Sequence, residues 1–319
     1  MSAADRPRLA VVIPAWKGAF LREAVDSVLA QTGDFSLHIG DDASPEDLRA
    51  VLGDRLSDPR VHYVRFEENK GGECLCSQWE RCVDLAGEVE WIWLFSDDDV
   101  MGPGCIEAFL RATETYPEAH LFRFPVSSID ESGAVLREFP LRDFETPEQI
   151  LALRLSNLID SFVVEYVFRR SEFLRQGRFQ KFDLAWGSDD ATWMKLMEVR
   201  PSKLLRGARV FWRKSRLNIS PDERNAALTI RKMRARIAWL KWVRGRYPWF
   251  NRSPSLDRLS RRWFLRNMEV RGLGYGALMA ACKEGFLELG WKGHLSAGCS
   301  LVLRRWFDRL GNRLAGKPL

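Results

Sequence analysis

The 319-residue sequence lacks the features that define several broad classes of protein. It contains no run of about 18 or more apolar residues, so a membrane-spanning helix is not expected. Its six cysteines form neither a CxxC pair nor a regular framework, and the opening residues, MSAADRPRLA, lack the apolar region of a signal peptide. We therefore expect a protein of the reducing cytoplasm.

Charge is distributed unevenly along the chain, whose formal net charge is +6. Residues 224–319 contain 21 Lys and Arg against 5 Asp and Glu, a balance of +16, whereas the remainder contains 28 against 38, a balance of −10. The contrast predicts two parts of opposite character: a domain of residues 1–221 and a basic, Trp-rich helical region of residues 222–319, with the boundary near Pro221.

The densest local charge follows the strongest local apolar run, in the stretch from Trp91 to Pro103, WIWLFSDDDVMGP. The five apolar residues that open it suit a strand buried on both faces, as in a parallel sheet. Asp97, Asp98 and Asp99 follow at once, and open α/β sheets bind ligands outside the carboxyl ends of their strands. Because adjacent carboxylates repel one another, a bound divalent cation would keep all three ionised. The alternative is a solvated acidic turn, with the proline at the first position of the next helix.

Elsewhere, apolar patterns alternate between the periods of strands and helices. Ser44, Pro45 and Asp47 have the positions of a helix cap, a first-turn proline and an acidic third residue. The alternation predicts an α/β fold with a mostly parallel, doubly wound sheet. Strands are predicted at 9–13, 37–39, 61–66, 91–95, 120–125 and 162–168, and helices at 20–29, 73–85 and 147–156.

Four segments occur in order along the N-terminal third: VVIPAWKGAFLREAVDSVLAQT, HIGDDAS, NKGG and FSDDDVMGP. Together they resemble the N-terminal half of the family 2 glycosyltransferases of GT-A fold, whose pattern runs VIIPxYN, SVLxQT, VDDxS, NxG and DxD. Five features in this order over about 95 residues are far more selective than any single motif. The resemblance covers roughly two-thirds of the chain and implies a Rossmann-like GT-A domain with a C-terminal basic helical extension outside it.

The resemblance also implies which residues bind the nucleotide. Trp16 stands where the family usually has tyrosine and still offers a stacking face. Asp42 matches the acid that accepts a hydrogen bond from the base, while Asp41 holds the loop; an Asx-turn or helix cap is the alternative for this pair. Lys70 carries a charge that favours a phosphate, although it also suits an exposed loop. The implied nucleotide-binding set is Pro14, Ala15, Trp16, Asp42, Lys70, Asp97 and Asp98.

The register of the DxD motif is ambiguous because three acids are adjacent. Asp97 and Asp99 satisfy the spacing, whereas alignment on the following proline makes Asp98 the metal ligand with Asp99 beside it. We take Asp97 and Asp99 as the metal-binding pair and Asp98 as the alternative. Their oxygen ligands suit Mg²⁺ or Mn²⁺ rather than zinc, and no His/Cys cluster competes. In such enzymes the metal bridges the two phosphates of the nucleotide-sugar and neutralises the charge of the departing diphosphate.

A second acidic segment, DLAWGSDDATWMKLM, begins at Asp183 and is similar to the ED motif of the family. Asp190 falls on the position of the catalytic base, with Asp189 as the alternative. An inverting transfer needs such a carboxylate to take the proton of the acceptor hydroxyl. The structural alternative is that Ser188 or Asp189 only caps a helix.

Basic residues follow in FWRKSRLNIS, which resembles the YRxHxxSxS stretch of the family. Ser215 stands where histidine is often found. Arg213, Lys214 or Arg216 would then supply positive charge to the diphosphate or the acceptor. An ordinary exposed basic loop explains the same residues equally well.

The C-terminal region combines tryptophans with arginines at helical spacing, around residues 234–246 and 301–313. Such helices suit the interface of an anionic membrane, or they pack on protein and expose their arginines. No nucleic-acid-binding module accompanies the charge. We therefore predict a metal-dependent hexosyltransferase that uses a nucleotide-sugar, most simply a UDP-sugar. The expected acceptor is a surface glycan or a lipid-linked glycan at the cytoplasmic face of the inner membrane. The alternatives are a sugar-phosphate nucleotidylyltransferase and a non-catalytic membrane adaptor.

Overall fold

The computed structural model describes residues 7–218, 226–268 and 273–314, with side chains up to Arg304. The chain divides into two compact units, each of which is described by itself. The predicted boundary at Pro221 lies outside the described residues. The first unit takes its described residues from Met1–Leu151, Leu158–Lys181 and Ser188–Ser215, and the second from Ala152–Asn157, Phe182–Gly187 and Arg216–Leu319.

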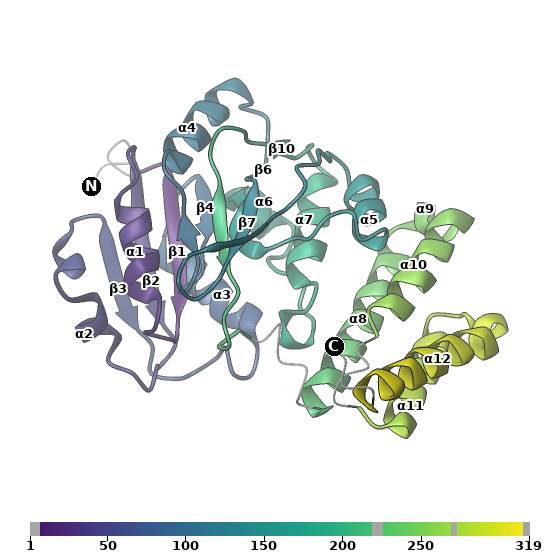
Figure 1. Cartoon of the computed structure of the whole chain (residues 1–319). Helices are drawn as coiled ribbons and strands as arrows, with labels where there is room; N and C mark the ends of the chain where they lie inside the picture. Colours follow the sequence, from purple (N-terminus) through teal and green to yellow (C-terminus); the bar gives the residue numbers. More distant parts are fainter. Residues whose placement is uncertain (1–6, 219–225, 269–272, 315–319) are drawn as a thin grey trace. The chain divides into compact units, whose positions relative to one another are not determined.

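A seven-stranded sheet forms the centre of the first unit, in the order β10-β6-β9-β4-β1-β2-β3 (Figure 1). Strands β4, β1, β2 and β3 are mutually parallel, whereas β9 runs antiparallel to both β4 and β6. The mostly parallel α/β sheet predicted from the sequence is thus confirmed. Its strands are β1 (Leu9–Ala15), β2 (Phe35–Asp41), β3 (Val61–Arg65), β4 (Trp91–Leu94), β6 (Leu121–Arg123), β9 (Tyr166–Arg169) and β10 (Lys203–Leu204).

A second, four-stranded sheet has the order β5-β11-β7-β8. Its strand β5 directly follows the three aspartates, and β11 ends at Arg213 and pairs antiparallel with β5 and parallel with β7. This small sheet therefore holds the segment after the acidic cluster against the segment that contains Arg213. Its strands are β5 (Val100–Met101), β7 (Val126–Ile129), β8 (Val135–Glu138) and β11 (Val210–Arg213).

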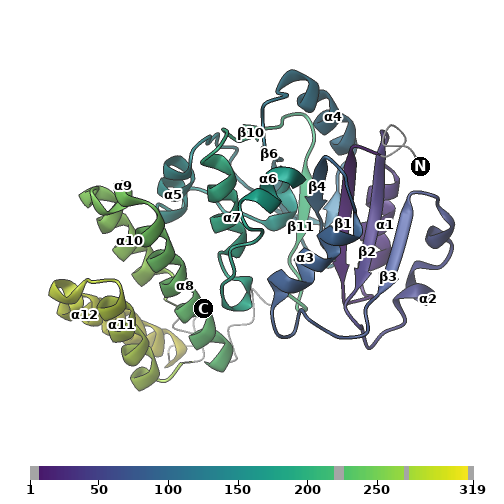
Figure 2. The same ribbon diagram turned by 180° about the vertical axis from the view of Figure 1, so that it is seen from behind.

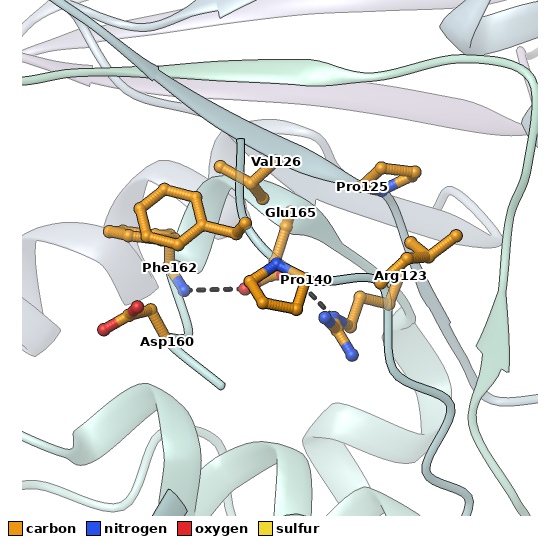
Figure 3. A pocket seen from close by; sticks show the side chains of 9 residues that line it. Arg123, Pro125, Val126, Pro140, Asp160, Phe162 and Glu165 are labelled. Carbon is orange, nitrogen blue, oxygen red and sulfur yellow. Dashed lines mark hydrogen bonds and ion pairs between the residues drawn. The ribbon is translucent and has the colours of Figure 1, made fainter. Parts of the chain in front are cut away.

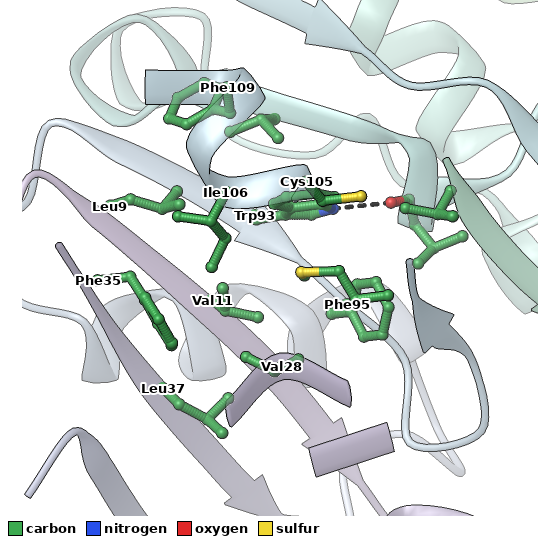
Figure 4. Packing of buried hydrophobic residues seen from close by; sticks show 14 of the residues in the cluster. Leu9, Val11, Val28, Phe35, Leu37, Trp93, Phe95, Cys105, Ile106 and Phe109 are labelled. Atoms are coloured by element: carbon green, nitrogen blue, oxygen red, sulfur yellow. Dashed lines mark hydrogen bonds between the residues drawn. The ribbon is translucent and has the colours of Figure 1, made fainter. Parts of the chain in front are cut away.

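Helices cover both faces of the large sheet (Figures 1 and 2). Figure 4 shows Val28 of α1 and Ile106 and Phe109 of α4 packed with alternate residues of β1 and β2, on one face. On the other face, α3 brings Cys82 against Gly40, where a β-carbon would meet the sulfur at 2.3 Å. The helices of this unit are α1 (Leu21–Leu29), α2 (Leu48–Leu52), α3 (Leu75–Leu85), α4 (Cys105–Thr115), α6 (Arg170–Arg175) and α7 (Ser188–Met197), while α5 (Pro147–Leu155) joins the two units in sequence.

Two local predictions, and the helix start in the alternative interpretation of the acidic stretch, were wrong in detail. Helix α2 begins at Leu48 with Asp47 as its N-cap, not at Ser44, whose hydroxyl instead donates to the Trp16 carbonyl. Helix α4 begins at Cys105, because Gly104 adopts a left-handed conformation that ends the preceding turn. The apolar run predicted as a strand over 162–168 opens with a 3₁₀ turn, and β9 begins only at Tyr166. In each case local propensity placed the segment correctly and the element boundary incorrectly.

The second unit is helical, as predicted for the basic region. Trp239 and Trp263 are buried and face each other, with ring centroids 5.4 Å apart, so the aromatic face of α8 packs within this unit. Ion pairs join Arg234 to Glu284 and Lys241 to Glu288. In the described part of the chain, no helix has both the length and the apolar content to cross a membrane. Its helices are α8 (Ala226–Arg246), α9 (Pro248–Asn251), α10 (Pro254–Arg266), α11 (Tyr275–Glu288) and α12 (Leu295–Leu314).

Candidate active site

The candidate site is built where three neighbouring parallel strands end. Strand β1 lies between β4 and β2 and is parallel to both, so the loops that follow the three strands emerge at one edge of the sheet. The loop after β4 carries the three aspartates, the loop after β1 carries Trp16, and β2 runs into Asp41 and Asp42. The topology thus gathers the predicted metal-binding and base-binding residues at the edge where α/β folds bind ligands.

Asp97 connects the first two of these loops. Its Oδ2 accepts hydrogen bonds from the backbone N–H of Trp16, at 2.9 Å, and of Lys17, at 3.0 Å. The Trp16 side chain is 45% exposed. An acid of the cluster therefore fixes the backbone that presents an exposed indole, and the indole face is available for stacking.

The other two acids of the cluster are also buried and held. Asp98 accepts from the Ser96 hydroxyl at 2.8 Å and lies 3.7 Å from the Lys17 ammonium, while Asp99 accepts from the backbone N–H of Arg213 at 2.8 Å. Burial, followed by the charge of Asp98, raises the pKa of Asp97 to about 6. The same two causes raise the pKa of Asp99 well above its usual value. The cluster is thus short of positive charge.

Arg213 supports the acidic cluster from inside the protein. Its fully buried guanidinium donates from Nε to the Asp98 carbonyl at 2.8 Å and from Nη1 to the Asp130 carbonyl at 3.0 Å, and Nη2 pairs with Glu23 at 2.7 Å. This inward orientation differs from the ligand contact predicted for Arg213, since a buried side chain with these partners presents no donor at the surface. Lys214, the next residue, is exposed.

The two acids after β2 have different partners. Asp41 accepts from the Ser44 backbone N–H at 2.8 Å and pairs with Arg65 at 2.7 Å, so it is tied into its own loop and into β3. Asp42 accepts from the backbone N–H groups of Lys70 and Gly71, both at 2.8 Å. A β-carbon at Gly71 would lie 2.6 Å from the Asp42 carboxylate, which explains the glycine in NKGG.

Sequence reasoning missed one partner of Asp42. Arg81 of α3 forms an ion pair with the Asp42 carboxylate, and its guanidinium lies over the Phe66 ring at 3.7 Å. The two residues of this ion pair are 39 positions apart, and no local pattern links them. The signal available in the sequence was only that an arginine stands in the predicted helix next to NKGG.

Asp190 and Asp189 lie at the start of α7 and act on different neighbours. Asp190 is buried, and its charge contributes to raising the pKa of Glu165, after the larger effect of burial and against the lowering effect of Arg123. The charge of Asp189 instead contributes to raising the pKa of Cys76, which reaches about 12 chiefly through burial. The helix-start interpretation and the catalytic one are therefore both compatible with Asp190, but its environment is the interior beside Glu165.

The donor set of the acidic cluster suits a hard divalent cation. One oxygen of Asp97 and one of Asp99 accept backbone N–H groups, and Oδ1 of Asp97 and Oδ2 of Asp99 are the oxygens that remain for a ligand role. Within the described ranges, no three His, Cys, Asp or Glu side chains are grouped as a complete metal-ligand set. Mg²⁺ is commonly held by one or two carboxylates together with substrate phosphates, so the arrangement fits such a cation.

The fold and this edge define a GT-A type of α/β domain. Residues 10–171 match the family model described as glycosyl transferase family 2, which is about half of the chain. The chain therefore belongs to glycosyl transferase family 2 and is a glycosyltransferase, as the sequence motifs predicted.

Solved structures with the same fold include complexes with sugar nucleotides. One is S. aureus TarS 1–349 in complex with UDP-GlcNAc, with a TM-score of 0.54 and 11% identity, covering 97% of this chain and 92% of that chain. The complex of the same protein with UDP has a TM-score of 0.53 and 12% identity, again covering 97% of this chain and 92% of that chain. GalNAc-T7 with UDP, GalNAc and Mn²⁺ has a TM-score of 0.52 and 12% identity, covering 72% of this chain and 48% of that chain. At sequence identities this low, these similarities show the fold alone.

Proposed function

We propose that this glycosyltransferase moves a hexose from a UDP-sugar to a hydroxyl of a glycan or lipid-linked acceptor, with inversion at the anomeric carbon. The observation that carries the proposal is the pair of hydrogen bonds from Trp16 and Lys17 to Asp97, which unites the stacking loop and the acidic cluster in one site. The first unit supplies this site, in the predicted catalytic domain of residues 1–221.

The donor end of the site is assigned to the loops after β1, β2 and β3. Trp16 stacks on the base, with Pro14 and Ala15 forming the same loop. Asp42 accepts from the base, and Lys70 contacts a phosphate. UDP as the nucleotide is supported by the sugar-nucleotide complexes of TarS and GalNAc-T7.

The three aspartates are proposed to hold Mg²⁺ or Mn²⁺ through Asp97 and Asp99, with Asp98 beside them. The Mn²⁺ in the GalNAc-T7 complex supports this assignment. When bound, such a cation neutralises negative charge on the leaving diphosphate. The protein's own contribution is to bury the carboxylates and to fix their orientation through Trp16 and Arg213.

Asp190 is proposed as the base that takes the proton of the acceptor hydroxyl, with Asp189 as the alternative. The place of Asp190 supports this role, because its carboxylate is buried at the start of α7 and its charge acts on the neighbouring Glu165.

The test of this function is release of UDP and transfer of sugar by the purified protein, with UDP-sugars as donors. Asp190→Asn should lower the transfer rate by about 10²-fold or more while the affinity for UDP stays unchanged. Asp189→Asn tests the alternative base and should keep the transfer rate of the unaltered protein if Asp190 is the base. If Asp190→Asn transfers sugar at the rate of the unaltered protein, the assignment of the base is wrong. A nucleotidylyltransferase would make pyrophosphate from a nucleoside triphosphate, and an adaptor would release no UDP.

The second unit is proposed to bring the enzyme to the cytoplasmic face of the inner membrane as a peripheral protein, where surface polysaccharides are assembled. Trp239 of α8 is buried within this unit, so it is not proposed as the contact, and the side chain of Trp306 lies outside the described residues. Arg258, Arg262 and Arg266 are exposed at intervals of four residues along α10 and form a basic stripe on one face of that helix. Such a stripe suits attraction to anionic lipid headgroups.

A further inference from the structure

We propose that Lys17 changes its anionic partner when the donor binds: its ammonium pairs with Asp98 in the metal-free protein and moves to the diphosphate of the bound donor. The inference rests on the glycosyltransferase function proposed above, and it adds a diphosphate-binding residue to the donor site. The observation behind it is that one residue of the Trp16 loop contacts two acids of the cluster. Lys17 contacts Asp97 through its backbone and Asp98 through its side chain.

Lys17 is fixed at its backbone and movable at its charged end. Its backbone N–H donates to Asp97 Oδ2 at 3.0 Å, whereas its ammonium lies 3.7 Å from Asp98 Oδ2. The second distance is longer than a hydrogen bond, so Asp98 attracts the ammonium through charge. The side chain is 25% exposed, and a lysine carries its point charge on a flexible four-carbon stem. The ammonium can therefore change partner while the loop that carries Trp16 stays in place.

The charge of Lys17 stabilises the acidic cluster in the metal-free protein. Asp97, Asp98 and Asp99 are all buried. The charge of Lys17 acts to lower the pKa of Asp97, against the larger raising effects of burial and of Asp98. A neutral side chain at position 17 would leave the three adjacent acids with less compensating charge. The metal-free protein should therefore be less stable without this ammonium.

The same ammonium disfavours the binding of a divalent cation alone. It lies beside the carboxylates proposed to hold Mg²⁺ or Mn²⁺, and like charges repel one another at short range. Under the proposed function, the donor brings an anionic diphosphate to the same cluster. The diphosphate offers the displaced ammonium of Lys17 a new charged partner. Lys17 thus opposes the binding of the cation alone and favours the binding of the cation together with UDP.

Two other basic residues of this region are placed differently. The Arg213 guanidinium is fully buried and donates to backbone carbonyls, so it cannot turn towards a ligand. Lys70 is exposed in the loop after β3, where its backbone N–H donates to Asp42. Lys17, by contrast, pairs from a partly exposed position with an acid of the cluster itself.

Two measurements on the full chain test the exchange: the rise in melting temperature with Mn²⁺ alone, and calorimetry of UDP at saturating Mn²⁺. Lys17→Met removes the charge. Without metal, its melting temperature should be lower by about 2 °C. It should reach a given rise in melting temperature at about threefold less Mn²⁺, the size expected for one partly exposed charge. It should bind UDP about tenfold more weakly, which corresponds to the loss of one charge-assisted contact.

Three further variants control for folding and for charge. Lys17→Gln, a second neutral variant, should behave like Lys17→Met. Lys17→Arg keeps the charge and should retain most of the UDP affinity. Lys203→Met is the matched control, because Lys203 of β10 also forms an ion pair, with Glu145 at 2.9 Å, and its side chain is 24% exposed. Its loss should change neither the Mn²⁺ response nor the UDP affinity.

The opposite directions of the two changes identify the exchange. If the neutral variants respond to Mn²⁺ no more readily than the unaltered protein, or bind UDP equally tightly, Lys17 does not change partner. A weaker response to both ligands would mean that Lys17 only supports the fold of the cluster, which also contradicts the proposal. If the unaltered protein binds no UDP at saturating Mn²⁺, the proposed donor function is wrong and this inference fails with it.

Discussion

Asp97 Oδ2 lies 2.9 Å from the backbone nitrogen of Trp16, across 81 positions of sequence. The carboxylate proposed to bind a cation therefore also positions the loop that carries an exposed indole. A residue with both roles couples the binding of a nucleotide base to the binding of its diphosphate. Under the proposed function, the two recognition tasks of a sugar nucleotide thus depend on one buried side chain.

Replacing Asp97 by asparagine should preserve the stability of the protein but weaken its binding of UDP. The amide oxygen still accepts from Trp16 and Lys17, while one charge leaves a crowded, buried cluster. Without metal at neutral pH, the melting temperature of Asp97→Asn should equal or exceed that of the unaltered protein. Calorimetry with UDP and Mn²⁺ should show affinity lower by about tenfold or more, since a tenfold change needs only about 1.4 kcal/mol. Asp54→Asn, at a carboxylate 87% exposed, is the control and should change neither quantity. A less stable variant with unchanged UDP affinity would contradict this role.

Arg213→Lys tests whether Arg213 positions the acidic cluster. An ammonium cannot reproduce the fork that reaches the Asp98 and Asp130 carbonyls together. The free energy of unfolding should fall by about 3 kcal/mol, the size typical of breaking a buried charged network. UDP affinity, measured far below the melting temperature, should also fall.

Arg169→Lys provides the comparison for that experiment. Arg169 pairs with Glu90 at 2.9 Å, at the end of β4 opposite the aspartates. Its loss should lower stability without changing UDP affinity. If Arg213→Lys behaves in the same way, Arg213 is structural alone.

Stability should depend on pH through His38. Burial, with a smaller effect from His62, lowers the pKa of His38 to about 4 in the folded protein, whereas an unfolded histidine titrates near its ordinary value of 6.5. Below pH 6.5 the unfolded chain therefore binds more protons than the folded one, so stability falls as the pH drops from 6.5 to about 4, by roughly 3 kcal/mol in total. Urea unfolding at several pH values gives the free energy of unfolding as a function of pH. That dependence should be weaker in His38→Gln, whereas His294→Gln, at an exposed position, should keep the pH dependence of the unaltered protein. The same pH dependence of the free energy of unfolding in all three proteins would refute this role of His38.

The basic stripe on α10 should bind anionic vesicles. Each arginine near such a surface contributes about 1 kcal/mol, so the unaltered protein should float with phosphatidylglycerol vesicles at low salt and stay behind with phosphatidylcholine. The double variant Arg258→Glu/Arg262→Glu should not float. Arg22→Glu/Arg111→Glu, with the same charge change at exposed sites of the first unit, should still float. Failure of the unaltered protein to float would remove the membrane proposal.

Much of the fold could be predicted from the sequence because its signals are local. Buried strands read as short apolar runs, and the acids stand directly after the strands that position them, as at Asp42 and Asp97. Parallel pairing then brings those strand ends to one edge without further information. Family membership was predictable for the same reason, since its motifs are these strand ends in order.

The partners of the site residues could not be predicted, because they are distant in sequence. Arg213 stands among basic residues that suggest an exposed loop, yet the end of β11 turns its side chain inward to carbonyls more than 80 positions away. Arg81 reaches Asp42 only because α3 packs beside β2. The small cavity beside Glu165 (Figure 3) likewise lies next to Phe162, which stacks on Trp212, 50 positions further along the chain.

The proposed donor site requires that the buried aspartates and the Trp16 loop bind a nucleoside diphosphate together with a divalent cation. Isothermal titration calorimetry of UDP, with and without Mn²⁺, tests it most directly. We expect heat of binding that requires Mn²⁺ and that disappears when Asp97, Asp98 and Asp99 are all changed to asparagine in a protein that still folds. Absence of heat with the unaltered protein, or the same heat with the triple variant, would contradict it.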